Sequence, residues 1–302
     1  MLQKHSETNE NEIQEKYLIV VDLDGTILPD FTNVDQKAAQ VLRELKEKGH
    51  KVCIATGRNY LSTLPIYKEI GLDTLLITYN GGYINHPLKK DISTIKIPIA
   101  NSVVKEILAE EIIKKNLLNF MVDSTNNQSL STSDDIYYQE IFFNGNPYIK
   151  GDVLKLLGNN DVLQLVLEFS NEERKINQII STLRKKFKSS ITFYCGTKLK
   201  AKNPKDKILV PDSSKLIIKI RNYNANKGEA TKLVAGYYNI PLARTIAFGN
   251  DINDIEMMNR VGIGVAVSNS ENNLKAYVHD ITEFDSRNGG VALYLTKWFK
   301  LK

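Results

Sequence analysis

The sequence predicts an α/β protein whose parallel-sheet core is interrupted by an inserted α+β domain. Short apolar runs alternate with amphipathic stretches at both ends of the chain, and this alternation is lost in the middle. Several of the apolar runs also end in polar residues and glycine, which is typical of a ligand-binding sheet edge. The predicted core comprises residues 1–83 and 222–302, with a polar extension at 1–16, and the inserted domain comprises residues 84–221.

The first core segment has the β-α-β-α-β pattern of a parallel sheet with right-handed crossovers. Residues 17–21 form a continuous apolar run, as in strands that are buried on both faces. Apolar residues recur at helical spacing over 35–48, before a second strand at 52–55. A helix that ends near Glu69 and a third strand at 75–77 complete the pattern.

The middle of the chain mixes strand pairs with helices, which indicates an antiparallel α+β unit. The predicted strands are 95–97, 117–122, 162–169, 191–194 and 216–220, and the predicted helices are 102–115 and 171–188. The polar stretch 123–135 and the lysine-rich stretch 198–214 are expected to be loops, the second of them an insertion between strands.

The alternation of helix and strand returns after Asn226. The predicted elements are a helix at 228–238, a strand at 245–248, a short helix at 253–259 and a strand at 263–267.

Composition excludes several classes of protein. Hydrophobic residues make up 42% and charged residues 25% of the 302 residues, as in soluble globular proteins. Two cysteines give no disulfide framework, residues 1–16 lack a signal-peptide apolar core, and no apolar run approaches the roughly 20 residues that span a membrane. We therefore expect a cytoplasmic protein, by default a monomer.

The net charge of +5 suits an anionic ligand. The basic segments 184–188 and 198–207 lack the interleaved aromatic residues of a base-stacking surface, so nucleic-acid binding is not expected.

Four predicted strand ends carry polar residues: Asp22 with Asp24, Thr56, Asn80, and the run 249–254. Because residues i and i+2 of a strand point to the same side, Asp22 and Asp24 can share one site. Two close carboxylates need a balancing cation, and Mg²⁺ prefers such oxygen ligands. Asn80, in the stretch Asn80-Gly81-Gly82, is equally compatible with a hinge and with a substrate contact.

Four short motifs in order resemble those of the haloacid dehalogenase-like phosphatases. They are Asp-Leu-Asp-Gly-Thr at 22–26, Ala-Thr-Gly-Arg at 55–58, Asn-Lys-Gly-Glu-Ala at 226–230 and Gly-Asn-Asp-Ile-Asn-Asp at 249–254. The insertion lies between the second and third motifs, as in the Cof-type, class IIB branch of that family. The resemblance covers about residues 17–295 and implies a Rossmann-like core with a cap domain that determines the substrate.

The resemblance also implies catalytic roles for two residues and a phosphate-binding role for Lys227. Asp22 would be the nucleophile that forms an aspartyl-phosphate intermediate, and Asp24 would donate and then accept a proton. Lys227 would hold the phosphate and Asp22 together.

The remaining roles implied by the resemblance concern phosphate and metal. Thr56, the Gly57 amide and Asn253 would bind the phosphoryl oxygens. Asp22, the Asp24 backbone carbonyl and either Asn250 or Asp251 would hold Mg²⁺. Asp251 is favoured slightly because it carries charge, although many relatives have aspartate at the position of Asn250. Asp254 would bind the metal through water or brace Lys227.

These features predict a Mg²⁺-dependent phosphomonoester hydrolase that acts on a small phosphorylated metabolite, such as a sugar phosphate or a phosphorylated cofactor. A phosphosugar mutase with the same nucleophile is one alternative. A phospholigand-binding or regulatory protein without turnover is another. The sequence does not name the substrate.

Overall fold

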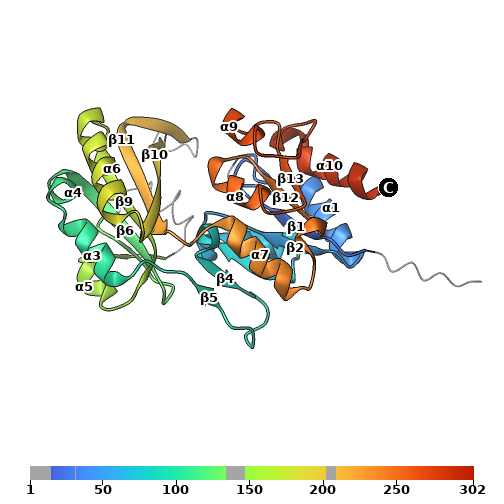
Figure 1. Ribbon diagram of the computed structural model, residues 1–302, viewed down its shortest axis with the longest axis horizontal. Coiled ribbons are helices and arrows are strands. Elements are labelled where there is room, and N and C mark those ends of the chain that lie inside the picture. The colour runs from blue at the N-terminus through green and yellow to red at the C-terminus, as the bar shows by residue number, and fades with distance from the viewer. Residues whose placement is uncertain (1–14, 31, 134–146, 202–208) are drawn as a thin grey trace, which may run out of the picture.

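The computed structural model describes residues 15–30, 32–133, 147–201 and 209–302. It forms two lobes, each built on its own large sheet, and the chain passes between them twice (Figure 1). Most of the predicted N-terminal extension, part of the 123–135 stretch and the middle of the 198–214 stretch lie outside the described residues.

The core lobe is a five-stranded parallel sheet, which agrees with the predicted fold class. In spatial order its strands are β14 (Asp280–Ile281), β13 (Ile263–Ala266), β12 (Thr245–Gly249), β1 (Leu18–Val21) and β2 (Lys51–Ile54). The central strand β1 pairs with β2 and β12, so segments from the two ends of the sequence lie side by side.

Helices cover both faces of the core sheet. They are α1 (Gln36–Glu47), α2 (Tyr60–Ile70), α7 (Lys227–Tyr237), α8 (Ile255–Met258), α9 (Asn272–Lys275) and α10 (Gly290–Phe299). Alternate residues of β1 enter different cores: Ile19 and Val21 pack with α1, α2 and α10, whereas Leu18 and Val20 pack with α7 and α8. This burial on both faces explains the uninterrupted apolar run of the strand.

A small sheet leads out of the core. Strand β3 (Leu76–Thr78) contacts the core sheet through a parallel bridge between Ala55 and Ile77. It then pairs antiparallel with β4 (Tyr83–Asn85), which pairs with β5 (Ile95–Lys96).

In the described residues of the second lobe, four helices accompany a six-stranded sheet. Its strands in spatial order are β10 (Ile191–Ala201), β11 (Leu209–Asn222), β9 (Val162–Ser170), β6 (Leu117–Ser124), β7 (Ser129–Ser131) and β8 (Ile149–Lys150). The helices are α3 (Asn101–Ala109), α4 (Glu111–Asn116), α5 (Val153–Leu157) and α6 (Glu173–Phe187). Strands β10 and β11 lie on the core side of α3 and α4 (Figure 1).

Three sequence predictions about this lobe were wrong. The predicted loop 198–214 is strand up to Ala201 and again from Leu209, because β10 and β11 pair as a long antiparallel ribbon. Strand β7 interrupts the predicted loop 123–135. The predicted helix 102–115 breaks at Glu110, whose extended backbone (ψ 124°) separates α3 from α4.

No helix in the described parts of the chain is both long enough and apolar enough to cross a membrane. Both cysteines, Cys53 and Cys195, are free thiols.

Candidate active site

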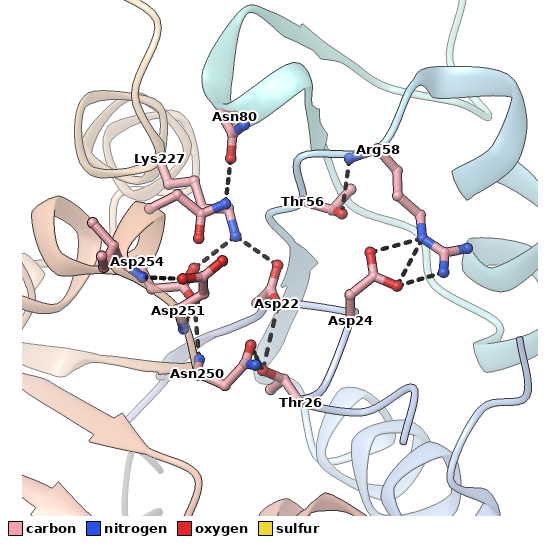
Figure 2. Close-up of polar contacts among 12 residues, drawn as sticks. Asp22, Asp24, Thr26, Thr56, Arg58, Asn80, Lys227, Asn250, Asp251 and Asp254 are labelled. Carbon is pink, nitrogen blue, oxygen red and sulfur yellow. Dashed lines mark hydrogen bonds and ion pairs between the residues drawn. The ribbon is translucent and has the colours of Figure 1, made fainter. Parts of the chain in front are cut away.

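The carboxyl ends of the three adjacent strands β2, β1 and β12 bring together the predicted site residues. Asp22 follows β1 directly, and its backbone N–H donates to the Phe248 carbonyl of β12 at 3.0 Å. Figure 2 shows Asp22 at the centre of a polar cluster, between Lys227 on one side and Asp24 on the other.

Lys227 is fully buried at the start of α7, where the Asn226 side chain caps the helix by accepting from Glu229 N–H. Its Nζ donates to Asp22 Oδ1 at 2.5 Å and to Asp254 Oδ1 at 2.6 Å. A buried ammonium of this kind persists only with such partners, because its hydration is lost. The lysine therefore fixes two carboxylates that come from opposite ends of the sequence.

Burial and charge shift the protonation equilibria of this pair. Desolvation raises the pKa of Asp22 to about 7, and Asp254 and Asp24 add to the rise while Lys227 opposes it. Burial alone would lower the pKa of Lys227, but Asp22 and Asp254 outweigh it and hold the pKa above the ordinary lysine value. The lysine therefore stays charged, and Asp22 needs further positive charge to be ionised fully at neutral pH.

Asp24 is held by Arg58, a residue to which the sequence analysis gave no role. Arg58 Nε donates to both carboxylate oxygens, at 3.1 and 2.9 Å, and Nη2 donates to Oδ1 at 2.5 Å. Arg58 N–H also donates to Thr56 Oγ1 at 3.1 Å. The second motif is thus joined to the first, with Asp24 turned toward Arg58 and away from Lys227 (Figure 2).

Asn250 lies against the loop that carries the two aspartates. The Thr26 hydroxyl lies 3.2 Å from Asn250 Oδ1 and 3.4 Å from Asp22 Oδ2. Gly25 has a φ of +74°, and a Cβ there would come within 2.4 Å of Asn250 Nδ2. The glycine of the first motif is therefore needed for both its backbone conformation and the approach of Asn250.

Asp254 organises the loop after β12. Its Oδ2 accepts from the backbone N–H groups of Asn250 (2.9 Å) and Asp251 (3.1 Å), while Oδ1 binds Lys227. Asp251 Oδ1 instead accepts from Ile252 N–H at 2.7 Å, at the start of the short 3₁₀ helix Ile252–Asp254. The carboxylate of Asp251 thus caps this helix, whereas that of Asp254 supports the loop and the lysine.

The predicted phosphate-binding residues meet at Asn80. Asn253 Nδ2 donates to Asn80 Oδ1 at 2.8 Å, and Asn80 N–H donates to the Thr56 carbonyl at 2.9 Å. Gly57 lies against the Asn80 side chain, since a Cβ on Gly57 would be 3.1 Å from Asn80 Nδ2. The Thr56 side chain is buried, and its oxygen accepts from Arg58, which leaves the hydroxyl proton for a ligand.

The donor set suits a hard, oxygen-binding cation. Among the described residues no three histidine, cysteine, aspartate or glutamate side chains gather as a metal cluster. The site instead offers the Asp22 carboxylate and the Asn250 amide oxygen, both next to Thr26. Mg²⁺ typically binds one or two protein carboxylates and completes its shell with water and substrate phosphate. The residues present therefore fit Mg²⁺.

The six-stranded sheet turns a polar face toward this site. Ile218 and Ile220 of β11 belong to the apolar core of that lobe, so Lys219 between them points to the opposite face. Lys219 keeps part of its side chain open to solvent, yet the surrounding protein desolvates its ammonium and lowers its pKa. Arg58 lowers this pKa as well, whereas Asp24 and Asp251 raise it, which places Lys219 within electrostatic reach of the site.

Comparison with known proteins identifies the family. A family model described as haloacid dehalogenase-like hydrolase matches residues 19–295, so the chain belongs to that family. Within it, a structural relative is the subclass IIB sugar phosphatase BT4131, with a TM-score of 0.70, 20% identity and coverage of 95% of this chain and 100% of that one. A haloacid dehalogenase-like hydrolase from Bacteroides thetaiotaomicron has a TM-score of 0.75, 20% identity and coverage of 94% and 100%.

Two relatives with assigned activities are similar over nearly their whole length. The 5-amino-6-(5-phospho-D-ribitylamino)uracil phosphatase YitU of Bacillus subtilis (strain 168) is 27% identical, over 94% of this chain and 98% of that protein. The HMP-PP phosphatase of Serratia proteamaculans (strain 568) is 23% identical, over 94% and 95%. The predicted family, fold class and phosphatase class are therefore confirmed.

Proposed function

We propose that this protein is a Mg²⁺-dependent phosphomonoester hydrolase that forms an aspartyl-phosphate intermediate on Asp22. One observation carries the proposal: the fully buried Lys227 ammonium joins Asp22 to Asp254 at the carboxyl edge of the sheet. Fixed positive charge beside a potential nucleophile is what phosphoryl transfer requires, because its transition state spreads negative charge over the phosphoryl oxygens.

The proposed reaction has two steps. An Asp22 oxygen attacks phosphorus, and the ester P–O bond breaks as the leaving oxygen takes a proton from Asp24. Water then attacks the aspartyl phosphate, Asp24 accepts the proton of that water, and inorganic phosphate leaves with Asp22 regenerated. Because Asp24 is bound to Arg58, we infer that its carboxyl group turns from Arg58 toward Asp22 when it transfers a proton.

The phosphoryl group would be bound by groups that already converge. Lys227 supplies charge, the Thr56 hydroxyl supplies a donor, and Asn253 lies beside them through Asn80. Bound Mg²⁺ would supply the further positive charge that Asp22 needs to be ionised. Asp22 and Asn250 would hold it together with the Asp24 carbonyl, and Asp251 is the weaker candidate because its carboxylate caps a helix.

We further propose that residues 84–221 act as a cap that selects the leaving group. The support is the polar face that this lobe directs at the site, with Lys219 on β11 as one of its charged residues. A small phosphorylated metabolite is the proposed substrate class, since the named relatives act on phosphorylated compounds of that size.

The test measures phosphate release from a panel of phosphorylated metabolites with and without Mg²⁺. We expect turnover only with Mg²⁺, and Asp22→Asn should reduce it by on the order of 10⁴-fold or more. Asp91→Asn, which neutralises an exposed aspartate, is the matched control. Equal turnover by wild type and Asp22→Asn would exclude Asp22 as the nucleophile. Accumulation of an isomeric sugar phosphate in place of inorganic phosphate would indicate a mutase.

A further inference from the structure

The turn after β3 has an unusual backbone. Tyr79 and Asn80 have φ values of +51° and +54°, and Gly81 follows with +95°, so three consecutive residues are left-handed. This region is costly for a residue with a side chain, most of all for a bulky one such as tyrosine. Such conformations persist where the surroundings impose them, and they occur often at functional sites.

The surroundings of this turn are two loops of the active site. Tyr79 N–H donates to the Arg58 carbonyl and Asn80 N–H to the Thr56 carbonyl, each at 2.9 Å. On the other side, a Cβ on Gly81 would lie 2.4 Å from the Asn226 carbonyl, immediately before Lys227. The turn is thus fixed between the second motif and the start of α7.

The Asn80 side chain bridges the groups proposed to bind phosphate. Its Oδ1 accepts from Asn253 Nδ2 at 2.8 Å, and its amide packs against Gly57. Figure 2 shows the Asn80 amide directed into the polar cluster from above Lys227.

The same turn contacts the inserted domain. The Tyr79 ring packs with Tyr83 of β4 and with Leu163 of β9. Tyr79 therefore touches the cap while its neighbour Asn80 touches the phosphate-binding residues.

We propose that Asn80 is a positioning residue for phosphate binding: its amide holds Asn253 against the Thr56–Gly57 loop, and its left-handed backbone joins that arrangement to the contact between Tyr79 and the cap. The inference rests on the proposed function, because it assigns phosphate binding to Thr56 and Asn253. Since Asn80 acts on groups that bind phosphate before and during the reaction, its loss raises KM and weakens phosphate inhibition more than it lowers kcat.

Three substitutions separate the side chain from the backbone. Asn80→Gly keeps the left-handed conformation without strain and removes the amide, whereas Asn80→Ala removes the amide and adds strain. Asn80→Asp keeps the acceptor for Asn253 but adds a negative charge beside the phosphate. The control is Asn239→Gly, at an exposed left-handed asparagine (φ +53°) just beyond the end of α7.

The measurements are KM, kcat, competitive inhibition by inorganic phosphate and the thermal shift that inorganic phosphate produces in the presence of Mg²⁺. We expect Asn80→Gly to raise KM and the phosphate inhibition constant about 3- to 10-fold, with an unfolding temperature equal to or above that of the wild type. Asn80→Ala should show the same kinetic change with a lower unfolding temperature, and Asn80→Asp a larger rise in KM. Asn239→Gly should leave KM unchanged.

The proposal would be overturned if Asn80→Gly had the same KM and the same phosphate inhibition constant as the wild type. Asn80 would then serve only to adopt the left-handed backbone conformation. The phosphate-induced thermal shift separates this inference from the proposed function. If the wild type showed that shift without turnover, and Asn80→Gly lost it, the positioning role would stand while the hydrolase function failed.

Discussion

Arg58 binds both carboxylate oxygens of Asp24, with the closest contact between Nη2 and Oδ1 at 2.5 Å. The guanidinium thereby fixes the orientation of the carboxylate that is proposed to transfer the proton. Among the side chains, only arginine offers a planar, bidentate set of hydrogen-bond donors.

We predict that Arg58→Met and Arg58→Lys both lower kcat/KM by about 10²-fold, since misplacement of a catalytic group by about 1 Å has an effect of that size. Steady-state kinetics with a substrate found in the metabolite panel would measure it. Arg43→Met, which removes a half-buried arginine of α1 that donates to the Glu69 carbonyl, is the control. Full activity in Arg58→Lys would show that charge alone is sufficient at this position.

Lys227 should be essential for stability as well as for activity. Lys227→Met leaves two buried carboxylates without their cation, and breaking a buried ion pair in this way costs about 3–5 kcal/mol of the free energy of unfolding. Urea unfolding would measure the loss. The double variant Lys227→Met/Asp254→Asn should recover part of it without recovering activity. Wild-type stability in Lys227→Met would contradict this account.

Asp123 is expected to make a pH-dependent contribution to the free energy of unfolding. Burial raises the pKa of Asp123 to about 6 from an ordinary value of 3.8, although Ser129 donates to Oδ1 at 2.5 Å. The folded protein then binds this proton more tightly than the unfolded chain, so the contribution of Asp123 is present below about pH 4 and is lost as pH rises to 6.

Asp123→Asn should therefore gain stability relative to the wild type as pH rises from 4 to 7, by at most about 3 kcal/mol. Urea unfolding of both proteins across this pH range measures the difference. Asp91→Asn should show no such trend, because Asp91 is exposed. A stability difference between Asp123→Asn and wild type that is independent of pH would show that Asp123 titrates normally.

Lys219 should influence which leaving group is accepted. Lys219→Met is expected to change the relative kcat/KM of anionic and neutral leaving groups about 10-fold or more, as a charged hydrogen bond would. Lys215→Met removes the same charge from the same face of β11, next to Glu168 at 4.0 Å, and should leave the preference unchanged. If wild type and Lys219→Met had the same relative kcat/KM values for anionic and neutral leaving groups, Lys219 would be excluded from substrate recognition.

The sequence predicted the fold class and the cluster around Asp22 because both depend on local patterns. A strand that is buried on both faces must be apolar throughout, and polar residues directly after it must lie at its carboxyl edge. The residues of the four motifs therefore could be placed before their distances were known.

Contacts set by tertiary geometry were not predictable in this way. Arg58 lies 34 residues from Asp24, and Asn80 lies 173 residues from Asn253, so no local pattern links these partners. The ends of β10 and β11 were missed for a different reason. The lysines at the end of β10 and the run Pro211-Asp212-Ser213-Ser214 at the start of β11 resemble a loop, but pairing between the two strands supplies the hydrogen bonds that hold them extended.

The position of β1 between β2 and β12 has a consequence for synthesis of the chain. Asp22 precedes Lys227 by 205 residues, and β12, which pairs with β1, follows the entire inserted domain. On the ribosome the inserted domain thus emerges with all its strands while the central strand of the core still lacks one neighbour. A nascent chain therefore contains Asp22, the proposed nucleophile, early but lacks its partner Lys227 until much later, so the proposed site can be completed only after residues 227–254 have been translated.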